Sequence, residues 1–182
     1  MIESFNFFRV GELGSINELI NAVDEFDNNK WTLFYERKLA RGVAAENTDT
    51  IPLLYDPKSL FPIKHTDFSK FEPFVSEINA ACAAVFGDCT IKQAMLTRLH
   101  PGVCIPRHKD KGPITAKTHR VHVAIRTNKD CWFTVDEESV NMLPGEIWVI
   151  DNVGKYHSVS NSGTTARIHL IVDLLDYGII KQ

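Results

Sequence analysis

The sequence has no excess of positive charge and no long apolar run. Its 182 residues carry 20 Lys and Arg against 23 Asp and Glu, a formal net charge of −3. No basic block stands out, so the electrostatic footprint of a nucleic-acid-binding protein is missing. No apolar stretch reaches the length of a membrane span, so we expect no membrane partner. An anionic small molecule is still allowed as a ligand, because a single arginine can bind one.

Metal-binding cysteine pairs and a secretory leader are also missing. The four cysteines form no CxxC pair, so a zinc knuckle is not expected. The N-terminal stretch MIESFNFFRVGELGS has no basic segment followed by an apolar run and a small-residue cleavage site. We therefore expect a cytoplasmic protein with free thiols. The sequence also shows no internal repeat and no low-complexity segment.

What is present suits one domain, residues 1–182, made of two regions of different texture. Residues 1–90 are expected to form a helical and loop support region, and residues 91–176 a β core. The clearest helix signal in the first region covers 69–86, where apolar residues recur on one face. Gly87 follows and is a typical residue after a helix end.

Three further signals lie in the support region. Ser15 is placed to cap a helix, with Glu18 three residues later as the capping-box partner. WTLFYE at 31–36 is strand-like. Residues 37–66 are rich in Arg, Thr, Asp and Pro, and we expect loops and short extended pieces there.

The second region consists of short segments that alternate in polarity, separated by turn residues. The predicted strands cover 94–100, 103–110, 119–127, 131–135, 139–143, 146–151, 156–161 and 166–175. Helices precede strands without βαβ alternation. This order favours a mainly β fold with N-terminal helices, a jelly roll or cupin-like barrel, over a parallel sheet.

A candidate metal site begins at PRHKDKG. His108 and Asp110 lie two residues apart, so in a strand both side chains point to one face and Lys109 to the other. A polar strand end beside a turn explains the same tripeptide. His157, at the start of a later strand, is the best third ligand. Two histidines and one carboxylate form the facial triad of non-haem Fe(II) oxygenases, which leaves three metal positions open.

A basic residue near this set indicates a particular cosubstrate. Bound Fe(II) with one aspartate keeps a net charge of +1, and 2-oxoglutarate would chelate it through one carboxylate and the keto oxygen. Its far carboxylate would need a partner inside the barrel, where an unpaired charge is costly. Arg167 lies ten residues after His157 within ARIHLIVDLL, and its guanidinium can bind a carboxylate through two bonds. A solvated strand arginine is the alternative.

These residues occur within a longer pattern, HKD…HRVHVAI…PGEIWVIDNVGKYHSVSN…ARIHLIVDLL. Over roughly residues 93–175 the pattern resembles the aspartyl/asparaginyl β-hydroxylase family of Fe(II)- and 2-oxoglutarate-dependent oxygenases. The resemblance implies a double-stranded β-helix fold. It implies that His108 and His157 bind the iron, and that Arg167 binds the far carboxylate of 2-oxoglutarate.

The same resemblance assigns Arg120 and His122 to contacts with the cosubstrate. A core histidine satisfied by a neighbour is the alternative for His122. The activity implied is hydroxylation of an amino-acid-like C–H bond, in a peptidyl Asp or Asn or in a free amino acid, using O₂. Some animal members have glycine where this chain has Asp110, so a full triad is closer to the bacterial members. Members that hydroxylate free proline carry an additional C-terminal domain, so that activity does not transfer directly.

The remaining features leave alternatives open. His65, His100 and His119 are expected to be structural or solvated. His169 has the same strand parity as Arg167 and is a candidate to line the pocket. Residues 37–66, the Lys111–Lys117 loop and Trp132 are candidates to line the substrate mouth. The rival functions are a cupin-like protein that binds a metal or small acid without turnover, and an inactive interaction module. Arg167 favours the oxygenase, because a simple metal binder does not need it.

Overall fold

Two antiparallel sheets face one another across the interior of the protein. The structure, a computed structural model, describes residues 5–26, 28–31, 48–55, 61–110 and 115–176. The larger sheet has six strands in the order β1-β8-β5-β10-β3-β2, and the smaller has four in the order β4-β9-β6-β7. The strands are β1 (Phe7–Glu12), β2 (Thr48–Leu54), β3 (Cys89–Leu99), β4 (Val103–His108), β5 (His119–Arg126), β6 (Cys131–Val135), β7 (Glu138–Val140), β8 (Glu146–Ile150), β9 (His157–Asn161) and β10 (Arg167–Asp176).

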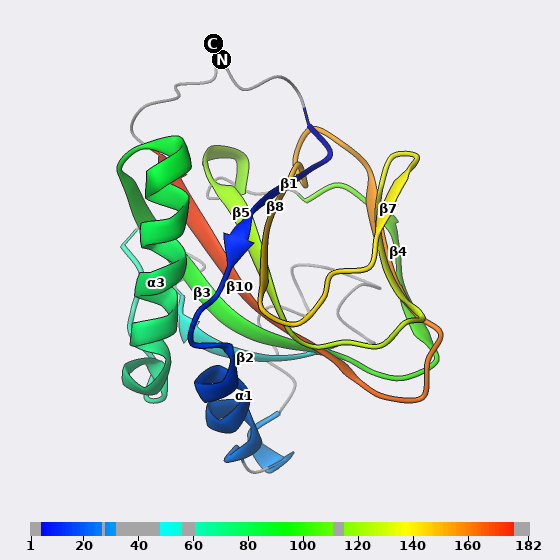
Figure 1. Cartoon of the computed structure of the whole chain (residues 1–182), viewed down its shortest axis with the longest axis horizontal. Helices are drawn as coiled ribbons and strands as arrows, with labels where there is room; N and C mark the ends of the chain where they lie inside the picture. Colours follow the sequence, from blue (N-terminus) through cyan, green and yellow to red (C-terminus); the bar gives the residue numbers. More distant parts are fainter. Residues whose placement is uncertain (1–4, 27, 32–47, 56–60, 111–114, 177–182) are drawn as a thin grey trace.

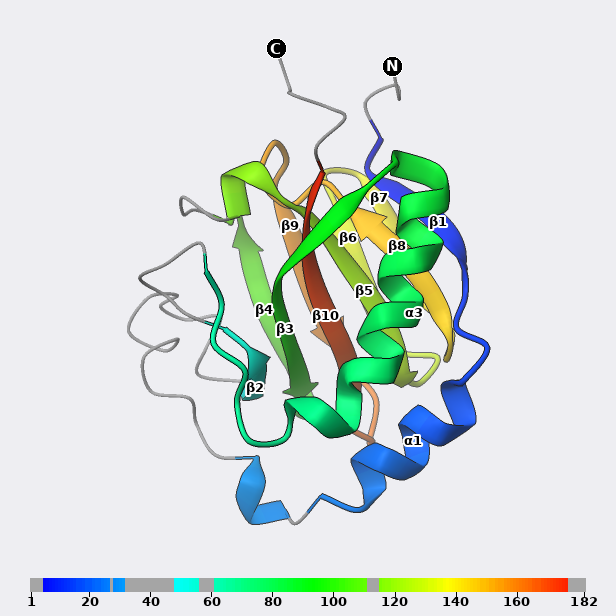
Figure 2. The same ribbon diagram turned by 90° about the vertical axis from the view of Figure 1, so that its left-hand side faces the viewer.

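Two α-helices lie on the outer side of the larger sheet, and the smaller sheet lies on its other side (Figures 1 and 2). They are α1 (Ile16–Asp24) and α3 (Phe68–Phe86). The second confirms the helix expected over 69–86, and Gly87 ends it with a positive φ of 84°, a backbone region that suits glycine. Short 3₁₀ turns occur at Asn28–Lys30 and Thr115–Lys117.

Burial of the larger sheet on both faces explains the texture of its central strands. In β5 every residue from Arg120 to Ile125 is buried. Val121 and Val123 belong to the core beneath the helices, whereas Ala124 belongs to the core between the two sheets. A strand covered on both sides carries inward polar residues only where they have partners or a function. Arg120 and His122 on β5 are of this kind.

The support region differs from its prediction in one contact and one element. Ser15 precedes α1 but makes no side-chain cap hydrogen bond, so the capping box with Glu18 is wrong. The Ser15 hydroxyl donates instead to the carboxylate of Glu77 on α3, which ties the two helices together. β1 was not predicted, because its sequence FFRVGE lacks strict alternation. It is an edge strand and pairs only with β8.

The segment 37–66 was expected to contain loops and extended pieces, and its described part includes the seven-residue strand β2. The strand expected at 31–36 lies outside the described residues except for Trp31.

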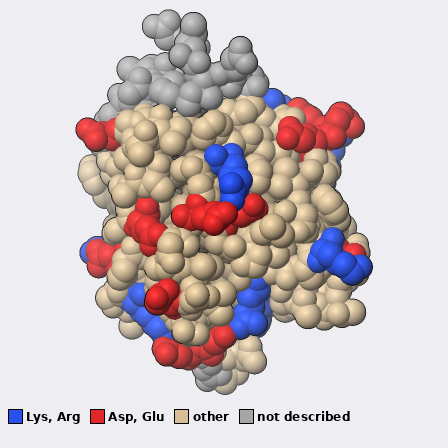
Figure 3. All heavy atoms as spheres, in the orientation of Figure 1, with Lys and Arg blue, Asp and Glu red and all other residues tan. Residues whose placement is uncertain are grey.

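The surface agrees with the absence of a basic block. Acidic and basic side chains are interspersed on the face shown in Figure 3, and no field of one sign covers it. Neither α-helix in the described part of the chain has the length and apolar content that a bilayer span requires. All four cysteines are free, with Cys82 and Cys131 buried, Cys89 half-buried and Cys104 exposed.

Candidate active site

The structure brings the three predicted metal ligands together beside the paired ends of β4 and β9. β4 ends at His108, β9 begins at His157, and the two residues are directly paired between antiparallel neighbours. Asp110 follows β4 by two residues, and its backbone N–H donates to the carbonyl oxygen of Asn152 at 2.9 Å. The potential ligand atoms of the three side chains all lie within 4.8 Å of one another.

Both histidines present a ring nitrogen to the same carboxylate oxygen. Nε2 of His108 lies 3.6 Å from Oδ1 of Asp110, and Nε2 of His157 lies 3.9 Å from it. His108 donates its Nδ1–H to the carbonyl oxygen of Pro106 at 2.7 Å, which leaves the Nε2 lone pair available to a metal. Burial lowers the pKa of His157 to about 4, so this imidazole is neutral at neutral pH. Two neutral imidazoles and one carboxylate fit a divalent first-row metal such as Fe(II).

The second oxygen of Asp110 is held by two buried donors. Asn152 donates its side-chain N–H to Oδ2 of Asp110 at 2.8 Å, and Arg120 donates to the same oxygen. Arg120 also binds both carboxylate oxygens of Asp173, at 2.7 and 2.8 Å. Asp110 is therefore fixed with Oδ2 in this network and Oδ1 toward the histidines. Lys109 makes a separate contact, since its ammonium group donates to the Gly154 carbonyl at 2.7 Å.

Arg120 lies between two buried carboxylates. Burial would lower its pKa, but the charges of Asp173 and Asp110 outweigh burial and raise it. Its guanidinium links Asp110 to Asp173 at the centre of β10. The cosubstrate contact that the resemblance implies for Arg120 stays a prediction.

Arg167 lies on the inner face of the barrel in a different electrostatic setting. Its residue is 5% exposed, and within the described part of the chain it forms no ion pair with a carboxylate. Burial lowers its pKa to about 10, so it is still a cation at neutral pH. An unpaired buried cation is costly unless an anion binds there.

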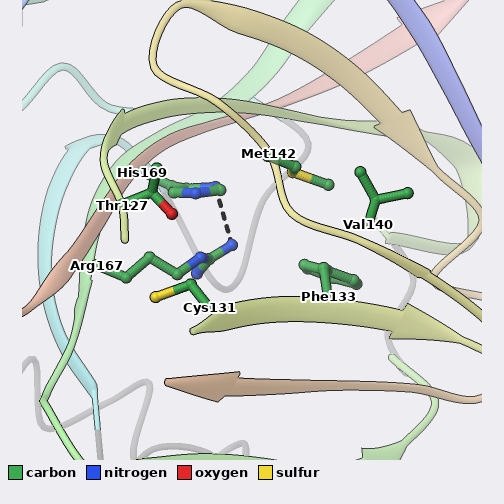
Figure 4. Close-up of a pocket in the computed structure, with 7 residues that line it drawn as sticks. All are labelled: Thr127, Cys131, Phe133, Val140, Met142, Arg167 and His169. Atoms are coloured by element: carbon green, nitrogen blue, oxygen red, sulfur yellow. Dashed lines mark hydrogen bonds between the residues drawn. The ribbon is translucent and has the colours of Figure 1, made fainter. Parts of the chain in front are cut away.

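A narrow pocket adjoins this arginine. Figure 4 shows Arg167 and His169 at one side of it, joined by a hydrogen bond of 2.9 Å. The pocket is lined by Thr127, Cys131, Phe133, Val140, Met142, Arg167 and His169. The position of Arg167 is therefore suited to an anionic group that enters the barrel.

One aromatic ring lies between this pocket and the metal ligands. The Phe133 ring stacks on the ring of His157 with centroids 6.0 Å apart. The guanidinium carbon of Arg167 lies 5.8 Å from the same Phe133 centroid. His122 packs edge-on against this ring at 5.2 Å. A ligand that joins the metal ligands to Arg167 would therefore run beside Phe133 and His122.

Sequence reasoning missed three of these residues. Asp173 had a usable signal, because a charged residue inside the apolar run LIVDLL needs a buried partner. Asn152 and Phe133 had none, since an asparagine after a strand and a phenylalanine within one are common. Their roles follow from contacts between segments far apart in sequence.

The other predicted residues lie away from the triad. His65 contacts the Tyr55 carbonyl oxygen at 3.2 Å, His100 contacts Asp49 at 3.1 Å, and His119 stacks on Phe86. Trp132 is 45% exposed on the outer side of β6. Much of 37–66 and of the Lys111–Lys117 loop lies outside the described residues, so their expected place at the substrate mouth stays a prediction.

Several solved structures share the fold. A prolyl hydroxylase from Trichoplax adhaerens, solved with a peptide fragment of the hypoxia inducible factor oxygen degradation domain, aligns with a TM-score of 0.64 at 10% identity, covering 94% of this chain and 84% of that one. An oxidoreductase of the 2OG-Fe(II) oxygenase family from Burkholderia pseudomallei aligns with a TM-score of 0.61 at 14% identity, covering 94% of both chains. A Pseudomonas putida prolyl-4-hydroxylase aligns with a TM-score of 0.52 at 12% identity, covering 96% of this chain and 95% of that one.

These likenesses confirm the predicted double-stranded β-helix. The sequence family described as aspartyl/asparaginyl β-hydroxylase matches residues 21–176. That range includes the three clustered ligands, the network that fixes Asp110, and the buried Arg167. This chain therefore belongs to the aspartyl/asparaginyl β-hydroxylase family.

Proposed function

We propose that this protein is an Fe(II)- and 2-oxoglutarate-dependent dioxygenase that hydroxylates an amino-acid-like C–H bond. The observation that carries the proposal is the pairing of two sites in one barrel. Two histidines and one carboxylate cluster between β4 and β9, and Arg167 is buried without a carboxylate partner among the described residues. The first suits a divalent metal, and the second suits the far carboxylate of a chelating dianion.

The residues of the chain divide the work. His108, Asp110 and His157 would hold the iron, which when bound supplies the O₂ chemistry that couples 2-oxoglutarate decarboxylation to C–H hydroxylation. Arg167 would bind the far carboxylate and so orient the cosubstrate. Phe133 would exclude water beside it.

The substrate belongs to the same proposal at a finer level. Membership of the family supports an amino-acid-like group, either a peptidyl Asp- or Asn-type residue or a free amino acid. The Trichoplax adhaerens relative in fold was solved with a peptide. The four free cysteines are in keeping with a reducing compartment, and we place the activity in the cytoplasm.

A non-catalytic cupin-like protein that binds a metal or a small acid is the alternative. It would use the same three ligands. Arg167 argues against a simple metal binder, because such a protein gains nothing from an uncompensated buried cation. A small-acid binder would also use Arg167, and it differs from the proposal in forming no succinate.

An anaerobic titration tests the proposal. Adding Fe(II) and then 2-oxoglutarate should produce a weak visible charge-transfer band. His157→Ala should abolish iron binding, whereas Arg167→Met should leave iron bound and weaken 2-oxoglutarate. Arg126→Met, which changes an exposed arginine paired with Asp24, is the matched control and should alter neither. A folded wild-type protein that binds iron but develops no band with 2-oxoglutarate would refute the proposal.

Substrate assignment needs a separate assay. Succinate formation is measured with free amino acids and with Asp- and Asn-containing peptides, above the level seen without substrate. A substrate raises succinate in proportion to its hydroxylated product. Decarboxylation that no amino acid or peptide stimulates would count against an amino-acid-like substrate.

A further inference from the structure

Two buried histidines lie next to Arg167, and one ring nitrogen of His169 is in contact with both Arg167 and His122. His122 is 4% exposed and His169 is 1% exposed, on the neighbouring strands β5 and β10. Nδ1 of His169 lies 2.9 Å from a terminal nitrogen of Arg167 and 3.3 Å from Nδ1 of His122. Nε2 of both rings is buried without a hydrogen-bond partner in the described part of the chain.

The donor and acceptor roles follow from the arginine. A guanidinium can only donate, so Nδ1 of His169 must carry a lone pair and its proton must be on Nε2. Burial lowers the pKa of both histidines well below 6.5, so each ring holds one proton. Arg167 uses the Nδ1 lone pair of His169, so the 3.3 Å contact with His122 does not fix the tautomer of His122.

We infer that His169 is a positioning residue for the cosubstrate site. Its Nδ1 lone pair accepts a hydrogen bond from Arg167 and holds the guanidinium at the pocket. This inference rests on the proposed function, since it assigns a role toward the carboxylate of 2-oxoglutarate.

The neutrality of His169 is part of the role. An aspartate at this position would also accept a hydrogen bond from Arg167, but its charge would neutralise the guanidinium and compete with an incoming carboxylate. A neutral acceptor orients the arginine and leaves its charge available. An apolar residue would leave the charge available but the guanidinium unrestrained.

Three substitutions separate these cases, with 2-oxoglutarate binding measured anaerobically on the Fe(II)-loaded protein. His169→Leu removes the acceptor and should weaken 2-oxoglutarate about tenfold, by loss of a hydrogen bond to a charged group. His169→Asn keeps an acceptor near the place of Nδ1 and should restore most of the affinity. His169→Asp should bind 2-oxoglutarate more weakly than His169→Leu does. Iron affinity should stay unchanged in all three variants.

A second measurement needs neither a variant nor the metal. In metal-free protein labelled with ¹⁵N-histidine, two-dimensional NMR distinguishes the two neutral tautomers. The expected result is a proton on Nε2 of His169. The control for the binding experiment is His119→Leu, a histidine substitution on the helix-facing side of the same sheet, which should leave 2-oxoglutarate affinity unchanged.

The inference fails if His169→Leu binds 2-oxoglutarate like the wild type, if Asn is no better than Leu, or if Asp does not weaken binding. A proton on Nδ1 of His169 in the wild type also overturns it. Failure of the proposed function has a different signature, because the wild-type protein would then not bind 2-oxoglutarate at all.

Discussion

The buried bridge from Asp110 through Arg120 to Asp173 can be tested by removing its charges one at a time and together. The side chains of Arg120 and Asp173 are 4% and 0% exposed. Breaking a buried pair from one side leaves an uncompensated charge and costs about 3–5 kcal/mol, whereas replacing both partners by apolar residues is often neutral. Arg120→Met leaves two buried carboxylates without their cation and should lower the free energy of unfolding by about 3–5 kcal/mol. Asp173→Leu keeps the ion pair between Arg120 and Asp110 and should cost less. The double variant leaves only the Asp110 carboxylate without its cation and should be more stable than Arg120→Met.

Metal affinity should follow a different pattern from stability. Arg120 donates to Oδ2 of Asp110, and loss of a residue that orients a metal ligand typically weakens metal binding about 10–100-fold. Arg120→Met and the double variant should both show this loss, although the double variant is the more stable of the two. Urea unfolding gives the stabilities, and calorimetric titration with Fe(II) under anaerobic conditions gives the affinities.

An exposed pair provides the control. Arg126 and Asp24 are 47% and 48% exposed, and Arg126→Met should cost less than about 1 kcal/mol with no change in metal affinity. If the double variant bound Fe(II) as tightly as the wild type, Arg120 would not orient Asp110 and the bridge would be structural only.

Three further predictions concern the same barrel and its support. In the metal-free protein, unfolding free energy should fall by about 2 kcal/mol between pH 7 and pH 5 from His157 alone, because the unfolded chain takes up a proton that the folded residue, with a pKa of about 4, excludes; a flat urea-denaturation profile would contradict this. Asn152→Ala should weaken Fe(II) binding about 10–100-fold while Asp110 keeps its bond to Arg120, and unchanged affinity by calorimetry would show that Asn152 is dispensable. Phe71 on α3 is fully buried against Phe26 and Phe74. Phe71→Ala should lower the free energy of unfolding by about 3–5 kcal/mol without altering Fe(II) affinity in the folded fraction. A loss under about 1 kcal/mol on chemical unfolding would contradict its place in the core.

Several elements were predictable because their signals are local. The helix over Phe68–Phe86 has an apolar face of helical period and a glycine at its end, and both can be read from neighbouring residues. The alternation in β5 predicted that Arg120 and His122 share one face of their strand. The alternation in β10 predicted the same for Arg167 and His169. β1 was missed because its sequence does not alternate.

The candidate site divides in the same way. The identities and spacing of His108, Asp110 and His157 were sufficient to nominate a metal site. The residue two positions after His108 was expected to share its strand, but β4 ends at His108. Asp110 reaches the site because its backbone bonds to Asn152, a contact across 42 residues that no spacing rule predicts.

The sequence by itself determined which chemical groups this protein has and on which side of each strand they point, because side-chain parity is a local property of an extended chain. Only the tertiary structure decided how those groups share partners. Arg120 and Arg167 both carry buried guanidinium groups on the inner face of the larger sheet. Arg120 lies between two carboxylates and is neutralised, whereas Arg167 lies beside a neutral histidine and has no carboxylate partner among the described residues. That difference comes from the register between β5 and β10 and from the return of the chain at Asn152, which are set by long-range pairing.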